Sequence, residues 1–527
     1  MSVYAEFTLH DLLHNSAERY PDKAAIVDGD SKHTYEDLSR QSGALCAALQ
    51  DSGVEKGDRV GVYMEKSWEA IVAMLAASRA GAAFVNLNPM FKPPQVRYVT
   101  EDCDIRVMIG DSGKLADLEP KTVERAFYRG DRPDSGGVTG ELTDLDEILK
   151  NDNSPREVRQ VSEVDLGTIL YTSGSTGMPK GVSTSQRNLV VGAQIVSTYL
   201  ENTEEDRILS ALPLNFDAGL NQFTTSLWVG ATLALQRSRL PGDLLKGLRR
   251  HEITGVAGVP PLWSLLLRSA KSVEAEPLTH LRYISNTGGR IPQANLDELR
   301  RLLEPTGTRI YLMYGLTEAF RSTYLPPGEI HRGTECIGKA IPDTEIMVIN
   351  KQGEECAPGE IGELVHRGPT VAMGYWGKEE ATRKAYRPNP LAPPELLDVE
   401  KVVYSGDNVR RDEEGFLYFI GREDAMIKSQ GYRMSPEEVE NLLIGSGFVH
   451  EACAFGIPDP DLGHQVVAVV SLKSDGQEGA IDKIREYAVN NGPPYMVPKE
   501  ILIQDELPKT GSGKIDRKGI SNAYADR

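Results

Sequence analysis

Residues 171–181 read Tyr171-Thr172-Ser173-Gly174-Ser175-Thr176-Gly177-Met178-Pro179-Lys180-Gly181 and follow an apolar run, residues 166–170, that is typical of a short buried strand. The string holds three glycines, four Ser or Thr residues and one lysine. Glycines let backbone N–H groups converge on an anion, the hydroxyls donate hydrogen bonds, and lysine adds a positive charge. The string therefore predicts a phosphate-binding loop, with a solvated Gly/Ser turn as the alternative.

The spacing of this loop separates it from two common nucleotide motifs. In a P-loop, Lys and then Ser or Thr follow the second glycine of G-x-x-x-x-G-K-[ST], whereas here Pro179 precedes Lys180 and Gly181 follows it. The dinucleotide motif G-x-G-x-x-G is absent from the sequence. The string instead resembles the signature loop of the adenylate-forming superfamily, which includes acyl-CoA synthetases, adenylation domains of nonribosomal peptide synthesis and luciferases. The resemblance implies that ATP is contacted by Thr172, Ser173, Gly174, Ser175, Thr176, Gly177 and Lys180.

The composition is that of an ordinary globular protein, with 40% apolar and 26% charged residues. Lys and Arg number 58 and Asp and Glu 77, and the net charge of −19 disfavours nucleic acid and anionic membranes as partners. Five scattered cysteines without C-x-x-C spacing indicate reduced thiols. The sequence contains no run of 18 apolar residues, so we expect no membrane insertion and a soluble, cytoplasmic protein.

The first third of the chain predicts alternating strands and helices. Residues 59–64 are β-rich, residues 67–80 have a helical pattern that ends at Gly81, and residues 82–87 are apolar again. This βαβ unit predicts an α/β fold whose parallel sheets carry helices on both faces. Residues 114–162 contain clusters of Gly, Asp and Pro and are expected to form surface loops.

Two changes of pattern predict the domain organisation. Short strands and frequent glycines over residues 334–421 indicate a small β-rich subdomain. Further on, a helix start at Ser435-Pro436, a pair of strands and a final helix near residues 481–491 indicate a small α+β unit. We therefore expect a large N-terminal body followed by a small C-terminal cap. The resemblance to the superfamily implies that residues 1–422 form the adenylation body, that residues 423–424 are a hinge, and that residues 425–527 form a mobile domain.

The string Tyr314-Gly315-Leu316-Thr317-Glu318 follows a strand-like run, so its polar residues would emerge at the end of a strand. A phosphate site needs a hydroxyl for the phosphate and a carboxylate for Mg²⁺. The string resembles the superfamily motif with these two functions. The resemblance implies that Thr317 contacts the α-phosphate, that Glu318 is both a catalytic residue and the Mg²⁺ ligand, and that Tyr314 lies at the nucleotide. A helix cap is the alternative.

Two further strings complete the expected nucleotide site. In Thr287-Gly288-Gly289 the glycine pair allows a purine to lie against the backbone, and the string resembles the adenine-binding segment of the superfamily, although Arg290 stands where Ala or Glu is more usual. Tyr404-Ser405-Gly406-Asp407 and Gly421-Arg422-Glu423-Asp424 resemble its ribose and hinge motif. The resemblance implies that Gly288, Gly289, Asp407 and Arg422 bind the nucleotide and that Asp424 is the hinge.

Near the C-terminus, Leu507-Pro508-Lys509-Thr510-Gly511-Ser512-Gly513-Lys514-Ile515 resembles the catalytic lysine loop of the superfamily. The resemblance implies that Lys514 bridges the attacking carboxylate and the α-phosphate during adenylate formation. It also implies that the C-terminal domain then rotates about Asp424 and brings residues 428–434 to the site, where Gly431 leaves room for the pantetheine arm of a thiol.

The acid substrate is expected to be small and polar, or an amino acid. Phe216-Asp217-Ala218 resembles the pattern of amino-acid adenylation domains, in which Asp pairs with the substrate ammonium, but Asp217 is also suited to cap a helix. Arg321 is expected to pair with an anionic group of the substrate or with an acid such as Glu329. By position in the resemblance, the substrate-binding residues are Asp217, Asn221, Ser285, Met313, Arg321 and Ser322.

The predicted activity is that of an AMP-forming acid–thiol ligase that uses MgATP and transfers the acyl group to CoA or to phosphopantetheine. Residues 216–222 and 320–327 also resemble stand-alone acyl-CoA ligases associated with bacterial exosortase gene clusters, which favours CoA. A carrier-protein acceptor would act in trans. The alternatives are an amino-acid adenylation enzyme specific for a carrier protein, a luciferase-like or amide-forming enzyme, and a nucleotide-binding regulator. The oligomeric state is left open.

Overall fold

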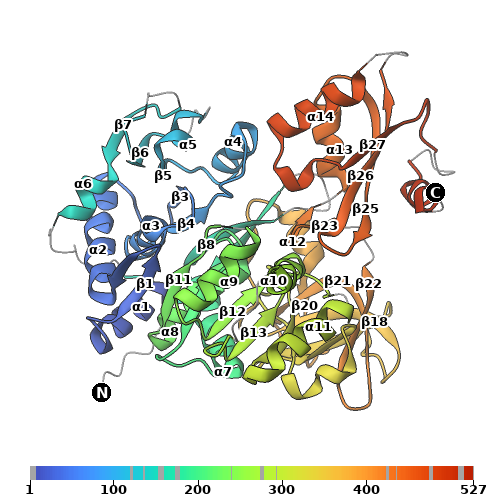
Figure 1. Ribbon diagram of the computed structural model, residues 1–527, viewed down its shortest axis with the longest axis horizontal. Coiled ribbons are helices and arrows are strands. Elements are labelled where there is room, and N and C mark those ends of the chain that lie inside the picture. Colours follow the sequence, from blue (N-terminus) through green and yellow to red (C-terminus); the bar gives the residue numbers. More distant parts are fainter. Residues whose placement is uncertain are drawn as a thin grey trace.

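The computed structural model describes residues 7–118, 123–133, 137–151, 160–172, 179–238, 240–272, 278–291, 293–422, 427–434, 436–473, 479–508 and 515–525. They form a large body built on two sheets and a smaller unit built on a third sheet, which lies beside the body at the C-terminal end of the chain (Figure 1). The fold is α/β, as the βαβ pattern predicted, and the arrangement is that of a large N-terminal domain followed by a small C-terminal one.

The first sheet of the body has eight strands and carries the signature string. Its order is β19 (Gly374–Tyr375), β9 (Lys180–Ser185), β8 (Leu166–Thr172), β4 (Ala83–Asn86), β3 (Arg59–Tyr63), β5 (Val107–Asp111), β6 (Arg125–Arg129) and β7 (Glu141–Asp144). The strands from β8 to β7 are parallel, whereas β8, β9 and β19 are antiparallel. The predicted βαβ unit is β3–α3–β4, with α3 spanning Trp68–Arg79.

The second sheet of the body has fourteen strands. Its order is β17 (Glu345–Ile349), β18 (Ile361–Arg367), β21 (Lys401–Arg411), β22 (Leu417–Arg422), β16 (Cys336–Ala340), β15 (Thr323–Leu325), β14 (Arg309–Tyr314), β13 (Tyr283–Asn286), β12 (Gly255–Gly258), β10 (Arg207–Ser210), β11 (Thr232–Leu235), β1 (Ala24–Asp28) and β2 (Ser31–Thr34), and β20 (Tyr386–Pro388) pairs with β21. The strands from β14 to β1 are parallel, and the remainder is antiparallel. The β-rich region is therefore continuous with the parallel part through β15 and β16.

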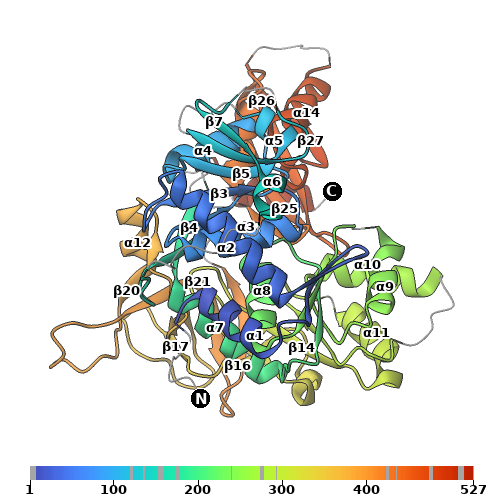
Figure 2. The same ribbon diagram turned by 90° about the vertical axis from the view of Figure 1, so that its left-hand side faces the viewer.

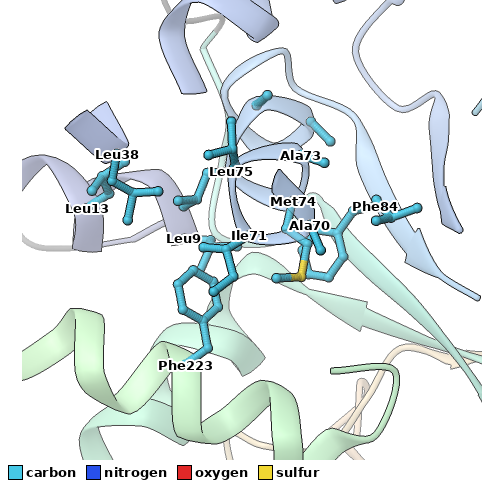
Figure 3. Close-up of a cluster of buried hydrophobic side chains, with 14 of the residues drawn as sticks. Leu9, Leu13, Leu38, Ala70, Ile71, Ala73, Met74, Leu75, Phe84 and Phe223 are labelled. Atoms are coloured by element: carbon cyan, nitrogen blue, oxygen red, sulfur yellow. The ribbon is translucent and has the colours of Figure 1, made fainter. Parts of the chain in front are cut away.

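Helices fill the space between the two sheets and cover their outer faces. The largest core cluster joins α1 (Leu9–Arg19), α2 (Tyr35–Asp51), α3 and α8 (Asp217–Val229). Figure 3 shows how its side chains converge, with Phe223 of α8 pointing towards Leu9 and Ile71. On another side of the body, α9 (Pro241–Arg250), α10 (Pro260–Ser272) and α11 (Gln293–Leu303) lie together (Figure 2). Further helices are α4 (Pro93–Asp102), α5 (Ser112–Ala116), α6 (Leu145–Lys150), α7 (Gln186–Leu200) and α12 (Glu379–Ala385).

The C-terminal unit has a five-stranded sheet covered by helices. Its strands are β23 (Ile427–Ser429), β24 (Tyr432–Met434), β25 (Val449–Asp459), β26 (Gly463–Leu472) and β27 (Glu500–Ile503). Two helices, α13 (Pro436–Ile444) and α14 (Ala480–Asn491), contribute Val439, Leu443 and Ile484 to its core. The predicted final helix corresponds to α14, but the chain adds α15 (Arg517–Ala525), which packs against β25.

The expectation of surface loops over residues 114–162 is wrong in part. Strands β6 and β7 and helix α6 lie in this region, and they extend the first sheet at its edge. In β6 the apolar core is only Ala126, Phe127 and Tyr128, which are buried between two arginines. Such a short apolar run between polar and glycine-rich segments gives little signal of its own, because the neighbouring strand supplies its stability.

All five cysteines are buried and carry free thiols. Burial raises the pKa of Cys103 and of Cys453 to about 12, and it also raises the pKa of Cys336 and Cys356. The expectation of reduced, unpaired cysteines is confirmed. No helix among the described residues is long and apolar enough to span a bilayer.

Candidate active site

A cavity of about 1060 Å³ lies between the body and the C-terminal unit. Its walls come from the carboxyl ends of parallel strands in the second sheet, from the β8–β9 hairpin of the first sheet, and from the β23–β24 hairpin of the C-terminal unit. The structure brings most of the described site residues together there. The predicted residues that line it are Thr172, Lys180, Asp217, Gly288, Gly289, Met313, Tyr314, Thr317, Glu318, Arg321, Asp407 and Gly431.

Some of the predicted site residues lie outside the described part of the chain. They are Ser173, Gly174, Ser175, Thr176 and Gly177 of the signature loop, the hinge residue Asp424, and the catalytic lysine Lys514. For Arg422 only the backbone is described, and it pairs in register with Asp407 across strands β21 and β22. Their roles stay predictions.

The signature hairpin presents its two ends to the cavity. Strands β8 and β9 pair antiparallel, with Thr172 opposite Lys180, so the loop between them begins and ends at the cavity wall. The ammonium group of Lys180 lies 5.2 Å from the centre of the Tyr375 ring. This contact places a positive charge beside the loop that is predicted to bind phosphates.

Glu318, the predicted Mg²⁺ ligand, is held by β19 and the segment before it. The Tyr375 hydroxyl donates a 2.7 Å hydrogen bond to Glu318 Oε1, and the Ala372 N–H donates to the Glu318 carbonyl. The same tyrosine therefore contacts both Glu318 and Lys180. Sequence analysis missed Tyr375, because it lies 57 residues after Glu318 in a two-residue strand with no motif of its own.

Replacing Tyr375 by phenylalanine is expected to lower the rate of adenylate formation about tenfold and to raise the Mg²⁺ concentration needed for half-maximal rate, because outer hydrogen bonds orient metal-binding carboxylates. Titration of Mg²⁺ in a pyrophosphate-exchange assay measures both effects. Tyr386→Phe is the matched control, since the Tyr386 hydroxyl donates a long 3.5 Å bond to the main-chain carbonyl of Glu318. Equal Mg²⁺ dependence in the wild type and Tyr375→Phe would contradict this role.

The nucleoside part of the predicted site is formed by residues at the ends of the neighbouring strands β13 and β14 and by Asp407 of β21, which lies further along the same sheet. Gly288 follows β13 with φ of +72°, and a Cβ there would lie 3.2 Å from Val259 Cγ1, so glycine suits this position on both counts. The Tyr314 hydroxyl at the end of β14 donates a 2.5 Å hydrogen bond to Asp407 Oδ2 on β21. Arg290, the departure from the usual adenine-binding pattern, is bonded to Thr334 and lies 3.2 Å from a Glu335 carboxylate oxygen.

The acid end of the cavity contains a buried ion pair. Arg321 Nη1 donates a 3.1 Å hydrogen bond to Asp217 Oδ2, and the two side chains are only 4% and 12% exposed. Burial raises the pKa of Asp217, although the Arg321 guanidinium opposes that shift. Asp217 is the first residue of α8, after the N-cap Phe216, so it does not cap the helix. Glu329, the acid suggested for Arg321, pairs with Arg332 instead.

Three of the predicted substrate-binding residues are buried beside the cavity and do not line it. The Asn221 amide donates to the Gly192 carbonyl at 3.4 Å, and Ser285 is 1% exposed within β13. Ser322 follows Arg321, and its hydroxyl lies 3.0 Å from Nδ1 of His366, a fully buried side chain. Asn221, Ser285 and Ser322 are therefore buried outside the set of residues that line the cavity, and their role in substrate binding stays a prediction.

His366 predicts a pH dependence of stability. Burial lowers its pKa to about 3, whereas the unfolded chain binds a proton there near pH 6.5. Between these values the unfolded state holds the extra proton, so this residue makes the free energy of unfolding fall with decreasing pH by up to about 1.4 kcal/mol per unit. His366→Gln is expected to remove about 1 kcal/mol of the loss between about pH 7 and 5.5, as measured by urea unfolding. An unchanged pH slope would contradict this assignment.

The C-terminal unit meets the cavity with its β23–β24 hairpin. Gly431, with φ of +84°, lies at the turn of the hairpin, and a Cβ there would come 3.0 Å from Val259 Cγ2 of the body. Tyr432 packs edge-on against Phe216 of the body and stacks on Tyr495. The residues on either side of the lysine loop, Leu507 and Ile515, instead pack in an apolar cluster with β25 and do not line the cavity.

Comparison with known proteins supplies the family. A family model described as AMP-binding enzyme matches residues 13–376, and one described as AMP-binding enzyme C-terminal domain matches residues 438–514. The chain belongs to the AMP-binding enzyme family. Its membership confirms the resemblance to the adenylate-forming superfamily that the signature, Thr317-Glu318 and lysine-loop strings indicated.

Relatives within the AMP-binding enzyme family have several activities. Tyrocidine synthase 1 of Brevibacillus parabrevis is 28% identical over 97% of this chain. The chain spans 45% of the length of that protein, and smaller shares of the other peptide synthases that it matches. A long-chain-fatty-acid–CoA ligase of Salmonella typhimurium is also 28% identical, over 97% of this chain and 94% of the ligase. Sequence identity at this level places the chain in the family without separating these activities.

One solved member of the family bears on the arrangement of the two units. The o-succinylbenzoate CoA synthetase of Bacillus subtilis, a double mutant bound to a CoA product analogue, is 27% identical and covers 97% of this chain and 98% of its own, with a TM-score of 0.83. The same enzyme in complex with AMP covers 96% of this chain and 97% of its own at 26% identity, but its TM-score is 0.68. The chain as a whole therefore superimposes better on the product-analogue complex than on the AMP complex.

Proposed function

We propose that the chain is an AMP-forming acid–thiol ligase. A carboxylate oxygen of the acid attacks the α-phosphorus of ATP, the bond from that phosphorus to the β-phosphate oxygen breaks, and pyrophosphate leaves. The sulfur of a thiol then attacks the carbonyl carbon of the acyl adenylate, the bond to AMP breaks, and the thiol proton passes to solvent. The observation that carries the proposal is the single cavity in which Lys180, Thr317, Glu318, Asp407 and Gly431 meet.

The residues present fit Mg²⁺ bound together with ATP. Within the described residues no group of three or more His, Cys, Asp and Glu side chains forms a metal site. Mg²⁺ is commonly held by one or two carboxylates and by substrate phosphates, so Glu318 alone is a sufficient protein ligand. Bound there, Mg²⁺ would neutralise phosphate charge, and Tyr375 would keep Glu318 oriented towards it.

The arrangement of the C-terminal unit supports CoA, or a phosphopantetheine on a carrier protein, as the thiol. We assign residues 1–422 to the adenylation body and residues 425–527 to a mobile domain that turns about Asp424. In the arrangement described here, Gly431 and Val259 are in contact and the lysine-loop flanks lie away from the cavity. A glycine at this point leaves space for a slender chain to pass between the two units, and a larger residue would close it.

Pyrophosphate exchange with a panel of carboxylic and amino acids, followed by product analysis with CoA, tests the proposal. An acid that supports exchange and yields an acyl-CoA confirms an acid–CoA ligase. Exchange with transfer only to a phosphopantetheinylated carrier protein assigns the carrier-specific alternative, and transfer to an amine assigns an amide synthetase. Nucleotide binding without exchange for any acid in the panel would overturn the proposal in favour of a regulator.

A further inference from the structure

We propose that the Asp217–Arg321 pair selects a short acid that carries a neutral hydroxyl or carbonyl group, and that it rejects amino acids. The inference rests on the proposed function and names its acid class. It starts from the 3.1 Å bond between the two side chains at the acid end of the cavity. An ammonium group needs the Asp217 carboxylate as its counter-ion, but Arg321 already occupies that carboxylate. Attraction to Asp217 would be offset by repulsion from a guanidinium at similar distance.

The body holds Arg321 in place from both sides. Phe320 adopts the left-handed conformation with φ of +61°, which is unusual for a bulky residue and indicates that surrounding contacts enforce it. Its ring packs so closely on Gly192 that a Cβ at Gly192 would lie 2.6 Å from the ring. After Arg321, the Ser322 N–H donates to the Tyr314 carbonyl and its hydroxyl meets His366. These contacts fix the main chain on both sides of Arg321, and the bonds of its guanidinium to Asp217 and to the Phe320 carbonyl hold the side chain beside Asp217.

The guanidinium has donors left for a substrate. Within the described part of the chain, the guanidinium of Arg321 makes two hydrogen bonds, and Nη1 donates both of them. One goes to Asp217 and the other to the Phe320 carbonyl. The Arg321 Nε atom is buried and has no hydrogen-bond partner among the described residues. The Nη2 atom likewise makes no hydrogen bond to the described residues. These two nitrogens form one edge of the planar fork, and a buried donor without an acceptor is costly. An oxygen of the substrate at this edge would remove that cost.

Charge and space decide which oxygen fits. A second carboxylate on the substrate would be attracted by Arg321 and repelled by Asp217, so it would gain little, whereas a hydroxyl or carbonyl oxygen accepts the hydrogen bond without that repulsion. At Met313 the cavity wall is backed by a buried cluster, which limits the room for a long chain at this point. The Tyr199 hydroxyl lies 3.5 Å from the Met313 sulfur, and Tyr199 belongs to a buried cluster with Tyr283 and Tyr311. The pair thus fits a short hydroxy or oxo acid.

Pyrophosphate exchange by the full chain with acids of matched size tests the inference. The probes are butanoate, 2- and 3-hydroxybutanoate, 2- and 3-aminobutanoate and succinate. We expect one of the hydroxy acids to exceed butanoate, succinate and the corresponding amino acid in kcat/KM by about tenfold or more. Arg321→Met is expected to reverse the order within the hydroxy and amino pair, because Asp217 is then left for the ammonium group.

Two further variants keep the result interpretable. Arg290→Met removes another arginine of the cavity wall, one that contacts Thr334 and Glu335, and is expected to leave the hydroxy-to-amino ratio unchanged. Asp217→Asn/Arg321→Gln removes both charges together and serves if Arg321→Met does not fold. It is expected to bring the kcat/KM of the preferred hydroxy acid down to that of butanoate.

Preference of the wild type for an amino acid or for succinate, or a ratio that Arg321→Met leaves unaltered, would overturn the inference while confirming adenylation. Absence of exchange with every acid would overturn the proposed function itself, and the inference with it.

Discussion

Replacing Lys514 by alanine is expected to lower pyrophosphate exchange by about 10²- to 10³-fold, because a positive charge aimed at the charge that develops on the α-phosphate is worth that much in a water-poor site. The same variant is expected to convert a supplied acyl adenylate to the thioester at nearly the wild-type rate. We propose that the second half-reaction uses the arrangement described here, in which the β23–β24 hairpin lines the cavity and the flanks of the lysine loop do not.

Lys509→Ala is the matched control for Lys514→Ala, since both lysines belong to one glycine-rich string and differ in position alone. It is expected to retain both half-reactions. Exchange by Lys514→Ala at the wild-type rate would remove Lys514 from the catalytic residues, and equal loss in the two half-reactions would indicate damage to the domain instead of loss of a catalytic charge.

Replacing Gly431 by leucine is expected to have the opposite signature, with thioester formation lowered by about 100-fold or more and pyrophosphate exchange largely retained. Gly431 has φ of +84°, and even a Cβ would approach Val259 Cγ2 to 3.0 Å, so a leucine side chain would fill the contact between the two units. Stopped-flow measurement of thioester formation from a supplied acyl adenylate, beside an exchange assay, separates the two effects.

Gly447→Leu provides the control for Gly431→Leu. Gly447 lies in the same unit with φ of +82°, but a Cβ there would meet no atom within 4 Å. Both variants therefore incur the backbone cost of a non-glycine residue in the left-handed region, about 1–2 kcal/mol, and only one of them obstructs the interface. A similar loss of thioester formation in both variants would show that strain, and not obstruction, is responsible.

Local patterns predicted those features whose cause is local. The β3–α3–β4 unit follows from the apolar periodicity of residues 59–87. The strings that are predicted to carry nucleotide chemistry could be recognised because each keeps its residue types within a few positions. Twelve of the predicted site residues lie at one cavity, and several of them do so because parallel strands of the second sheet end at the same edge.

Contacts between distant parts of the chain were beyond the reach of such patterns. Asp217 and Arg321 are 104 residues apart, so nothing near either residue indicated that each is the other's partner. Tyr375 reaches Glu318 only because β19 pairs with β9 at the edge of the first sheet. Asn221, Ser285 and Ser322 do not line the cavity, and a match by position could not show this, because it locates the region of a site but not which side chain faces inwards. Their role in substrate binding stays a prediction.

The burial of all five cysteines has a chemical consequence for an enzyme of the proposed kind. An acyl adenylate is a reactive electrophile, and a thiolate of the protein itself would compete with the acceptor for it. Cys336 borders the cavity, yet it is only 1% exposed and its pKa is raised, so it offers neither access nor a charged sulfur. The other four are buried elsewhere in the fold. The molecule is thereby protected against acylating itself during the interval in which the intermediate waits for its thiol.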